Sequence, residues 1–209
     1  MNLNIPYMET DNKLLNDAYR IAAGDIVGNI VYYQNGLLTE EKPCMIAGLD
    51  YNTPWTRDTA INIWNALSIL SPEVSKNTLL AVLEEEEGNI YIGGQYWDSI
   101  IWMIGAREYC RFHKDDNFYR LAFEAGRNSV HRLEEDEFDE EDGLFRGPAV
   151  YGDGIAAYPD KYSKCPNQGS GILEWVDYPG NPVYPKGYGI PMKALSTNCV
   201  YFKAYEILA

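Results

Sequence analysis

A chain of 209 residues with 46% hydrophobic and 23% charged residues has the composition of one globular domain, long enough to bury a core. The 17 basic and 31 acidic residues leave a net charge of -14, which argues against nucleic-acid binding and against attraction to anionic membranes. The same charge disfavours a strongly anionic substrate, unless Arg57, Arg146 and Lys161 concentrate positive charge locally.

Apolar residues at three- and four-residue spacing predict six helices, which we expect to pack as antiparallel pairs in an all-α fold. The expected ranges are residues 11–33, 58–70, 71–87, 97–113, 118–133 and 192–208. Asn35-Gly36 and Gly88 are interpreted as helix stops, and Ser71-Pro72 as a helix start. Residues 37–57 are expected to form a loop, apart from a short strand near Met45-Ile46.

Residues 134–191 are expected to be mostly loop, beginning with an acidic run and continuing with many Gly, Pro and Tyr. A loop of this length in a compact domain is usually functional or disordered. Its aromatic side chains favour a functional loop, because rings with polar edges are typical of carbohydrate sites. Tyrosine also packs helices, so the 17 tyrosines of the chain are not specific by themselves.

No targeting or crosslinking signal is visible. Apolar runs are shorter than the roughly 20 residues of a membrane span, and the N-terminal region lacks the pattern of a signal peptide. Four scattered cysteines without a CxxC pair predict neither a zinc site nor a disulfide framework. We expect a cytoplasmic protein with reduced thiols and no metal, although a chain whose signal had been removed would look the same.

The first candidate site precedes the expected helix 58–70. A loop interrupted by Pro54 presents Trp55, Arg57 and Asp58 just before that helix. An aromatic face can stack on a sugar ring, while a guanidinium and a carboxylate bond to neighbouring hydroxyls. The simpler alternative is that Arg57 and Asp58 cap the helix and pair with each other.

Two further candidates follow the same pattern. Residues 93–99 bring Trp97 and Asp98 to the start of the next helix, where Asp98 or Ser99 could instead act as an N-cap. Asp153 lies between two glycines and next to Tyr151. An Asp in an aromatic pocket can have the raised pKa of a general acid, but Gly-Asp-Gly is also a common turn.

The fourth candidate lies at the start of the last expected helix, where Ser196, Thr197 and Asn198 either cap the helix or bind a ligand. A catalytic role is not expected for His113 or His131, which lie on polar helix faces.

The order of these motifs resembles the six-hairpin, (α/α)6-toroid glycosidases, which include glucoamylases, trehalases, debranching-type α-glucosidases and α-L-rhamnosidases. The resemblance covers residues 14–209 and depends on four stretches. They are PWTRD, GGQYWDSIIWMIGAREYCRFHKDDNFYR, DEEDGLFRGPAVYGDGIAAYP and LSTNCVYFKAYEILA. It implies that Arg57 and Asp58 hold the sugar at the cleavage point, and that Trp97 and Asp98 enter the sugar pocket. Asp153 matches the general acid of the family.

The resemblance further implies that Asn198 lines the site, with ring contacts from Trp55 and Tyr151. These toroids have twelve helices, so residues 1–209 would form one partial catalytic domain, completed by a missing C-terminal half or by self-association. The expected function is hydrolysis of an α-linked sugar, with an α-glucoside as the expected substrate and no cofactor. The alternative is a non-catalytic carbohydrate-binding or interaction protein that keeps the sugar-facing loops.

Overall fold

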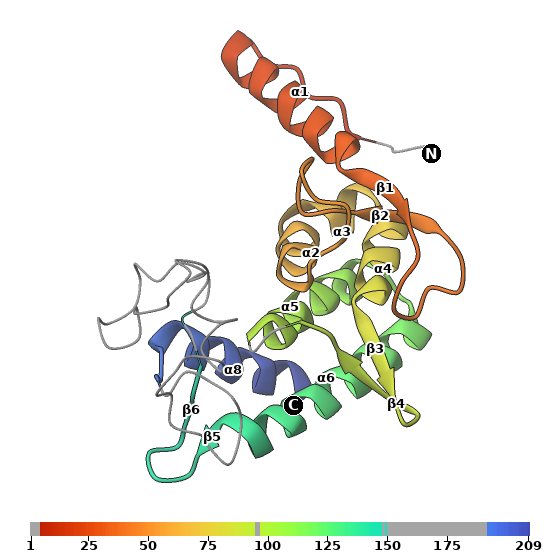
Figure 1. Ribbon diagram of the computed structural model, residues 1–209. Coiled ribbons are helices and arrows are strands. Elements are labelled where there is room, and N and C mark those ends of the chain that lie inside the picture. The colour runs from red at the N-terminus through yellow and green to blue at the C-terminus, as the bar shows by residue number, and fades with distance from the viewer. Residues whose placement is uncertain (1–4, 95–96, 148, 150–191) are drawn as a thin grey trace.

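The computed structural model describes residues 5–94, 97–147, 149 and 192–209. Within these ranges the helices are accompanied by three two-stranded antiparallel sheets, so the fold is mixed α/β (Figure 1). The expected all-α fold, and with it half of an (α/α)6 toroid, is therefore wrong. The cause is that strands of four residues, such as those at 30–33 and 83–86, are too short for periodicity to distinguish them from the last turn of a helix.

Helices and hairpins alternate along the chain. They are α1 Lys13–Gly28, α2 Thr56–Asn62, the π-helix η1 Ile63–Leu67, α3 Ser68–Leu70, α4 Pro72–Ala81, α5 Trp97–Phe112, α6 Asp116–Glu137 and α8 Leu195–Leu208. The strands are β1 Ile30–Tyr33, β2 Lys42–Met45, β3 Leu83–Glu86, β4 Asn89–Ile92, β5 Phe138–Asp139 and β6 Leu144–Phe145. Each strand pairs with its neighbour in sequence.

The helices expected at 58–70, 97–113, 118–133 and 192–208 are confirmed to within a few residues. Those expected at 11–33 and 71–87 are too long, because each is a helix followed by a strand. Glu87 and Gly88 both have positive φ, 51° and 81°, and join β3 to β4 in a tight hairpin. Gly88 is thus a hairpin turn and not a helix stop.

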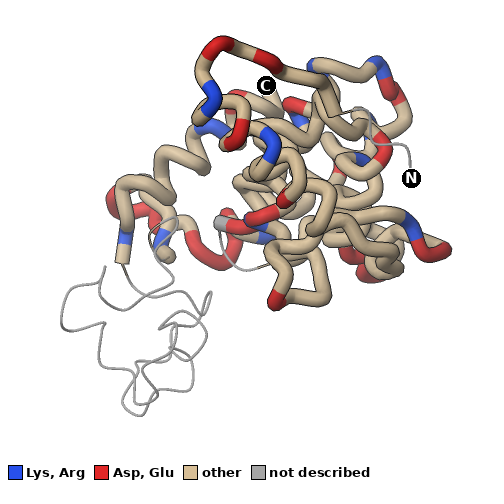
Figure 2. Tube along the Cα trace, turned by 90° about the horizontal axis from the view of Figure 1, so that it is seen from above, with Lys and Arg blue, Asp and Glu red and all other residues tan. Residues whose placement is uncertain are grey.

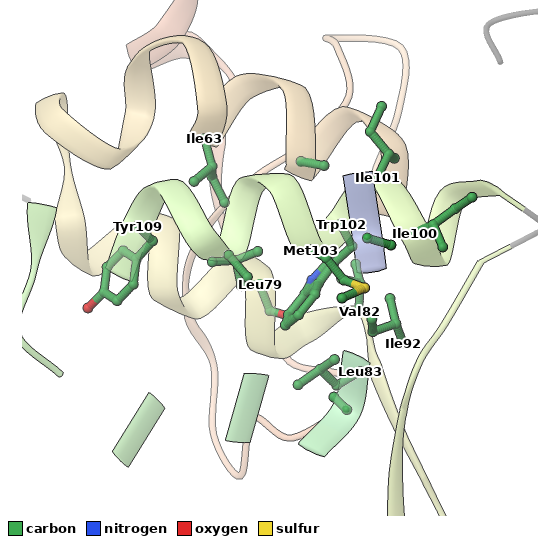
Figure 3. Packing of buried hydrophobic residues seen from close by; sticks show 14 of the residues in the cluster. Ile63, Leu79, Val82, Leu83, Ile92, Ile100, Ile101, Trp102, Met103 and Tyr109 are labelled. Atoms are coloured by element: carbon green, nitrogen blue, oxygen red, sulfur yellow. The ribbon is translucent and has the colours of Figure 1, made fainter. Parts of the chain in front are cut away.

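The core forms around α5, which lies between the other helices in Figure 1. Ile100, Ile101 and Trp102 on α5 are at most 2% exposed, and Figure 3 shows Trp102 close to Leu79. The Trp102 indole N–H donates to the Leu79 carbonyl at 3.3 Å, which pairs the one polar atom of the buried ring. Burial of these side chains supplies much of the driving force for folding.

Polar side chains on the helices bind the free edges of two hairpins. The bonds are Met45 N to Thr78 Oγ1 (3.0 Å), Asn77 Nδ2 to Pro43 O (3.2 Å), Ile92 N to Ser129 Oγ (2.8 Å) and Asn128 Nδ2 to Ile90 O (3.1 Å). Adjacent residues, Asn-Thr on α4 and Asn-Ser on α6, thereby satisfy backbone groups that a two-stranded sheet leaves unpaired. These bonds dock each hairpin on its helix.

The acidic excess is partly neutralised by ion pairs. Lys and Arg lie among Asp and Glu along the described trace (Figure 2). Lys76 of α4 binds Asp115 at 2.6 Å, and Lys193 binds Asp139 at 2.7 Å. Both pairs connect segments that are far apart in the sequence, so they help to fix how those segments are arranged.

The first helix differs from the rest. It projects from the body of the molecule in Figure 1, and none of its residues is buried. Among the helices that the structure describes, none is sufficiently long and apolar to cross a membrane.

Candidate functional site

The site begins where α2 begins. Trp55 occupies the N-cap position with an extended backbone, and its carbonyl accepts the first helical hydrogen bond from Thr59 N at 2.8 Å. Its indole ring is 44% exposed and meets Tyr51 edge-on, with the ring centroids 6.2 Å apart. The ring is therefore held at the surface, at a helix N-terminus.

Arg57 and Asp58 lie in the first turn of the same helix. Arg57 Nε is 4.0 Å from Asp58 Oδ2, which is an ion pair but too long for a hydrogen bond between these two atoms. The Asp58 carboxylate also lies near the positive end of the helix dipole, where a negative charge is favourable. Their side chains are 21% and 35% exposed, so both remain within reach of a ligand.

The structure brings the start of α5 beside the start of α2. Thr56 Oγ1 donates to the Gly93 carbonyl at 2.9 Å. Gly94 has a φ of 110°, and a Cβ there would lie 2.9 Å from Asp98 Cβ and 3.0 Å from Thr56 Oγ1. Only glycine fits this position, and its absence of a side chain lets Asp98 approach Thr56. We call this junction the α2–α5 opening.

The predicted site residues separate into three groups. Trp55, Arg57 and Asp58 lie at the start of α2, and Asp98, which is only 9% exposed, lies at the start of α5, so all four are at the α2–α5 opening. Trp97 begins α5, but its side chain falls outside the described part of the structure. Tyr151 and Asp153 also lie outside the described residues, so their roles stay predictions.

Asn198 is largely committed to the backbone. Its Oδ1 accepts from Phe145 N at 2.8 Å, and its Nδ2 donates to the Phe145 and Ala194 carbonyls, each at 3.0 Å. Both amide hydrogens and one lone pair are therefore used in holding β6 against α8. Only the second lone pair of Asn198 Oδ1 is left to accept a hydrogen bond from a ligand. The role of Asn198 at the sugar stays a prediction.

Glu84 on β3 is a residue of the opening that the sequence did not indicate. A Cβ on Gly93 would lie 2.5 Å from Glu84 Oε1, so this exposed carboxylate covers the same glycine whose carbonyl binds Thr56. Glu84 belongs to a run of four glutamates that was interpreted as the end of a helix. Glu84 is placed over Gly93 because residues 83–86 form a strand, and the sequence did not predict that strand.

Two of the cysteines, Cys44 and Cys110, are poor nucleophiles. Cys44, Cys110 and Cys199 are free thiols, and Cys165 lies outside the described residues. Burial raises the pKa of the Cys44 thiol to about 12 and that of Cys110 to about 11, so both stay protonated at neutral pH. Within the described ranges, no group of three His, Cys, Asp or Glu side chains is arranged to hold a metal ion.

A scan against models of known protein families finds no match for this chain, and searches of curated proteins and of solved structures also find none. The glycosidase resemblance therefore depends on the sequence motifs alone. The function has to be argued from the residues that the fold brings together.

Proposed function

We propose that this chain binds an uncharged carbohydrate at the α2–α5 opening and acts as a glycoside hydrolase on an α-linked sugar. The observation that supports the proposal is the junction of two helix starts through Thr56, Gly93 and Gly94. It brings the starts of α2 and α5, which lie some forty positions apart in the sequence, next to each other.

The side chains at this junction have complementary tasks. The exposed Trp55 ring offers a face for a pyranose, and Arg57 offers donors in a fixed fork. The carboxylates of Asp58 and Asp98 accept hydrogen bonds from sugar hydroxyls. Such a set binds a neutral polyol better than an anion, because the opening holds more carboxylates than guanidiniums.

Besides these binding groups, hydrolysis needs a carboxylate that activates water or attacks the sugar carbon, and an acid that protonates the leaving oxygen. We assign the task of the acid to Asp153, on the motif resemblance alone, since it lies outside the described residues. Sugar binding and hydrolysis are therefore tested separately. The alternative, a carbohydrate-binding protein without turnover, shares the binding residues and differs only in the absence of catalysis.

Calorimetric titration with maltose, together with an assay on an aryl α-glucoside, tests the proposal. Arg57→Gln and Asp98→Asn should each weaken maltose binding by about 10- to 100-fold, the usual loss when a charged hydrogen-bonding group is removed. Arg120→Gln, an exposed site on α6, is the matched control and should leave binding unchanged.

Asp153→Asn should lower turnover by roughly 10²–10⁴-fold while maltose binding stays within a few-fold of the parent. Binding without turnover in the parent chain would select the carbohydrate-binding alternative. A parent chain that binds no α-linked sugar, or variants Arg57→Gln and Asp98→Asn that bind as well as Arg120→Gln, would contradict both.

Self-association is also proposed. Exposed apolar side chains on α1, such as Leu14 (78% exposed) and Ile21 (64%), support it, because a second copy could cover them. Light scattering that gives a monomer mass over a wide concentration range would contradict it.

A further inference from the structure

A hollow lies between α5, α6 and α8, where it is formed by residues that the carbohydrate proposal does not use. Its volume is about 300 Å³, at the lower end of the range for small-molecule sites. Ala106 on α5 and Ala122 on α6 line it, and these short side chains leave space between the helices. We call it the α5–α8 pocket.

The floor of this pocket is apolar and well packed. Trp102, Met103 and Ala106 line it and are 0%, 3% and 2% exposed. Figure 3 shows Trp102 and Met103 together within the hydrophobic cluster of α5. Phe123 on α6 and Ile207 on α8 add apolar walls. A ligand that reaches this floor gains hydrophobic free energy, so the inner part of the ligand should be apolar.

The rim of the pocket carries charge of both signs. Arg111 binds both carboxylate oxygens of Glu108, at 2.8 and 2.9 Å, and Glu206 binds Lys203 at 2.7 Å. The Arg107 side chain is exposed, and within the described ranges it forms no hydrogen bond or ion pair. Its guanidinium is thus the group at the rim that is available for an anion.

Cys110 also lines the pocket, but it does not make the pocket a catalytic site. Burial, and secondarily the nearby Asp115 charge, raises the pKa of this thiol to about 11. A protonated thiol is a poor nucleophile and behaves as a small apolar group. The pocket is therefore suited to binding and not to covalent chemistry.

We propose that the α5–α8 pocket binds a small molecule that has an apolar tail and one carboxylate. The tail lies on Met103, Ala106 and Phe123, and the carboxylate pairs with the fork of Arg107. A single negative charge fits better than a dianion such as a phosphate, because Arg107 is the one unpaired guanidinium among the described residues that line the pocket. This proposal does not depend on the carbohydrate function.

Octanoate is the first probe, with octan-1-ol and octylammonium as matched ligands of the same tail and different charge. In calorimetric titrations of the whole chain, octanoate should bind about fivefold tighter than either, as expected for one exposed ion pair. Arg107→Gln should remove this preference while octan-1-ol binding stays unchanged. Arg120→Gln, on α6 and outside the pocket lining, should keep the preference.

The location of the binding site is tested by a substitution whose larger side chain fills the α5–α8 pocket. Ala122→Leu should abolish binding of octanoate and octan-1-ol, whereas Ala22→Leu on exposed α1 should not. If Ala122→Leu fails to fold, methyl NMR spectra of the unmodified chain decide the location. Octanoate should then shift the Met103, Ala106 and Ile207 methyl signals and leave those of Leu38 and Val74 in place.

Three results would overturn the proposal: equal affinity for the three probes, equal behaviour of Arg107→Gln and Arg120→Gln, or methyl shifts confined to other parts of the molecule. Absence of any binding by octanoate would overturn it as well.

Discussion

The helices α1 and α5 have the same length, 16 residues, and opposite surroundings. None of the residues of α1 is buried, whereas Ile100 and Trp102 on α5 are 0% exposed. Both segments carry the apolar periodicity that predicts an amphipathic helix. The difference teaches that periodicity predicts the helix but not whether another element covers its apolar face.

The two helices are also stabilised by different interactions. At α1 the Asn12 side chain accepts from Leu14 N at 3.0 Å and Leu15 N at 3.3 Å, and Lys13 pairs with Asp17 one turn on. These contacts are local, and local contacts alone stabilise a short helix only marginally. At α5 the stability comes from packing, so mutations there should have larger effects.

The largest effect is expected from Trp102→Ala. It removes a fully buried ring and leaves a cavity, which should lower the free energy of unfolding by about 3–5 kcal/mol. Urea denaturation followed by circular dichroism measures this loss. Trp64→Ala is the control, since that ring is 47% exposed and should cost much less. Equal losses at both sites would contradict the central position of α5.

The second-largest effects are expected from two glycine substitutions that change the free energy of unfolding in opposite directions. A Cβ on Gly105 of α5 would lie 2.9 Å from both Cα and O of Ala60, whereas one on Gly24 of α1 meets nothing within 4 Å. Gly105→Ala should therefore destabilise by about 1–3 kcal/mol through overpacking against α2. Gly24→Ala should stabilise by about 0.5–1 kcal/mol through helix propensity.

Thermal unfolding of both variants under identical conditions tests this pair. If Gly105→Ala raised the melting temperature as Gly24→Ala should, the close approach of α2 and α5 would be wrong, and the α2–α5 opening would lose its support.

A smaller effect is expected in the pH dependence of stability, through Asp115. The hydrogen bond from Lys76 is the main reason that the pKa of Asp115, just after α5, lies below its usual value of 3.8. A depressed pKa adds stability that is present above about pH 4 and is lost as the pH falls through the folded-state value. Lys76→Met should therefore flatten the decline of stability as the pH falls below about 4. An unchanged slope in acid denaturation would contradict this role.

The smallest effect is expected from Ile21→Ser on α1. Its side chain is 64% exposed, so the free energy of unfolding should change by no more than about 0.5 kcal/mol. Ile101→Ser on α5, where the side chain is 2% exposed, is the matched control and should be strongly destabilising. A large loss for Ile21→Ser would show that α1 is covered in solution, for instance by a second copy.

Much of the helical framework follows from local sequence, and the strands do not. Ser71-Pro72 starts α4, and Asp115 caps α6 by accepting from Phe118 N at 3.0 Å. The strands at Ile30–Tyr33 and Leu83–Glu86 have only four residues each, and they exist because a helix binds the edge of each hairpin. Those contacts join residues more than thirty positions apart, which no local pattern contains.

The candidate site also has features that follow from local sequence and features that do not. The sequence indicated Trp55, Arg57, Asp58 and Asp98 as polar and aromatic side chains at helix starts, and the structure has them there. The approach of the two helix starts depends on the hydrogen bond from Thr56 to the Gly93 carbonyl, a contact across 37 positions. Glu84 was missed for the same reason, because its strand was interpreted as helix.

By itself the sequence determined where most helices begin and end, since caps, proline and apolar spacing act within a few residues. Only the tertiary structure decided that α5 is buried and α1 exposed, that three hairpins interrupt the helices, and that the starts of α2 and α5 lie next to each other. Those features are set by packing and hydrogen bonding between distant segments, whose free energy is gained only when the whole chain folds.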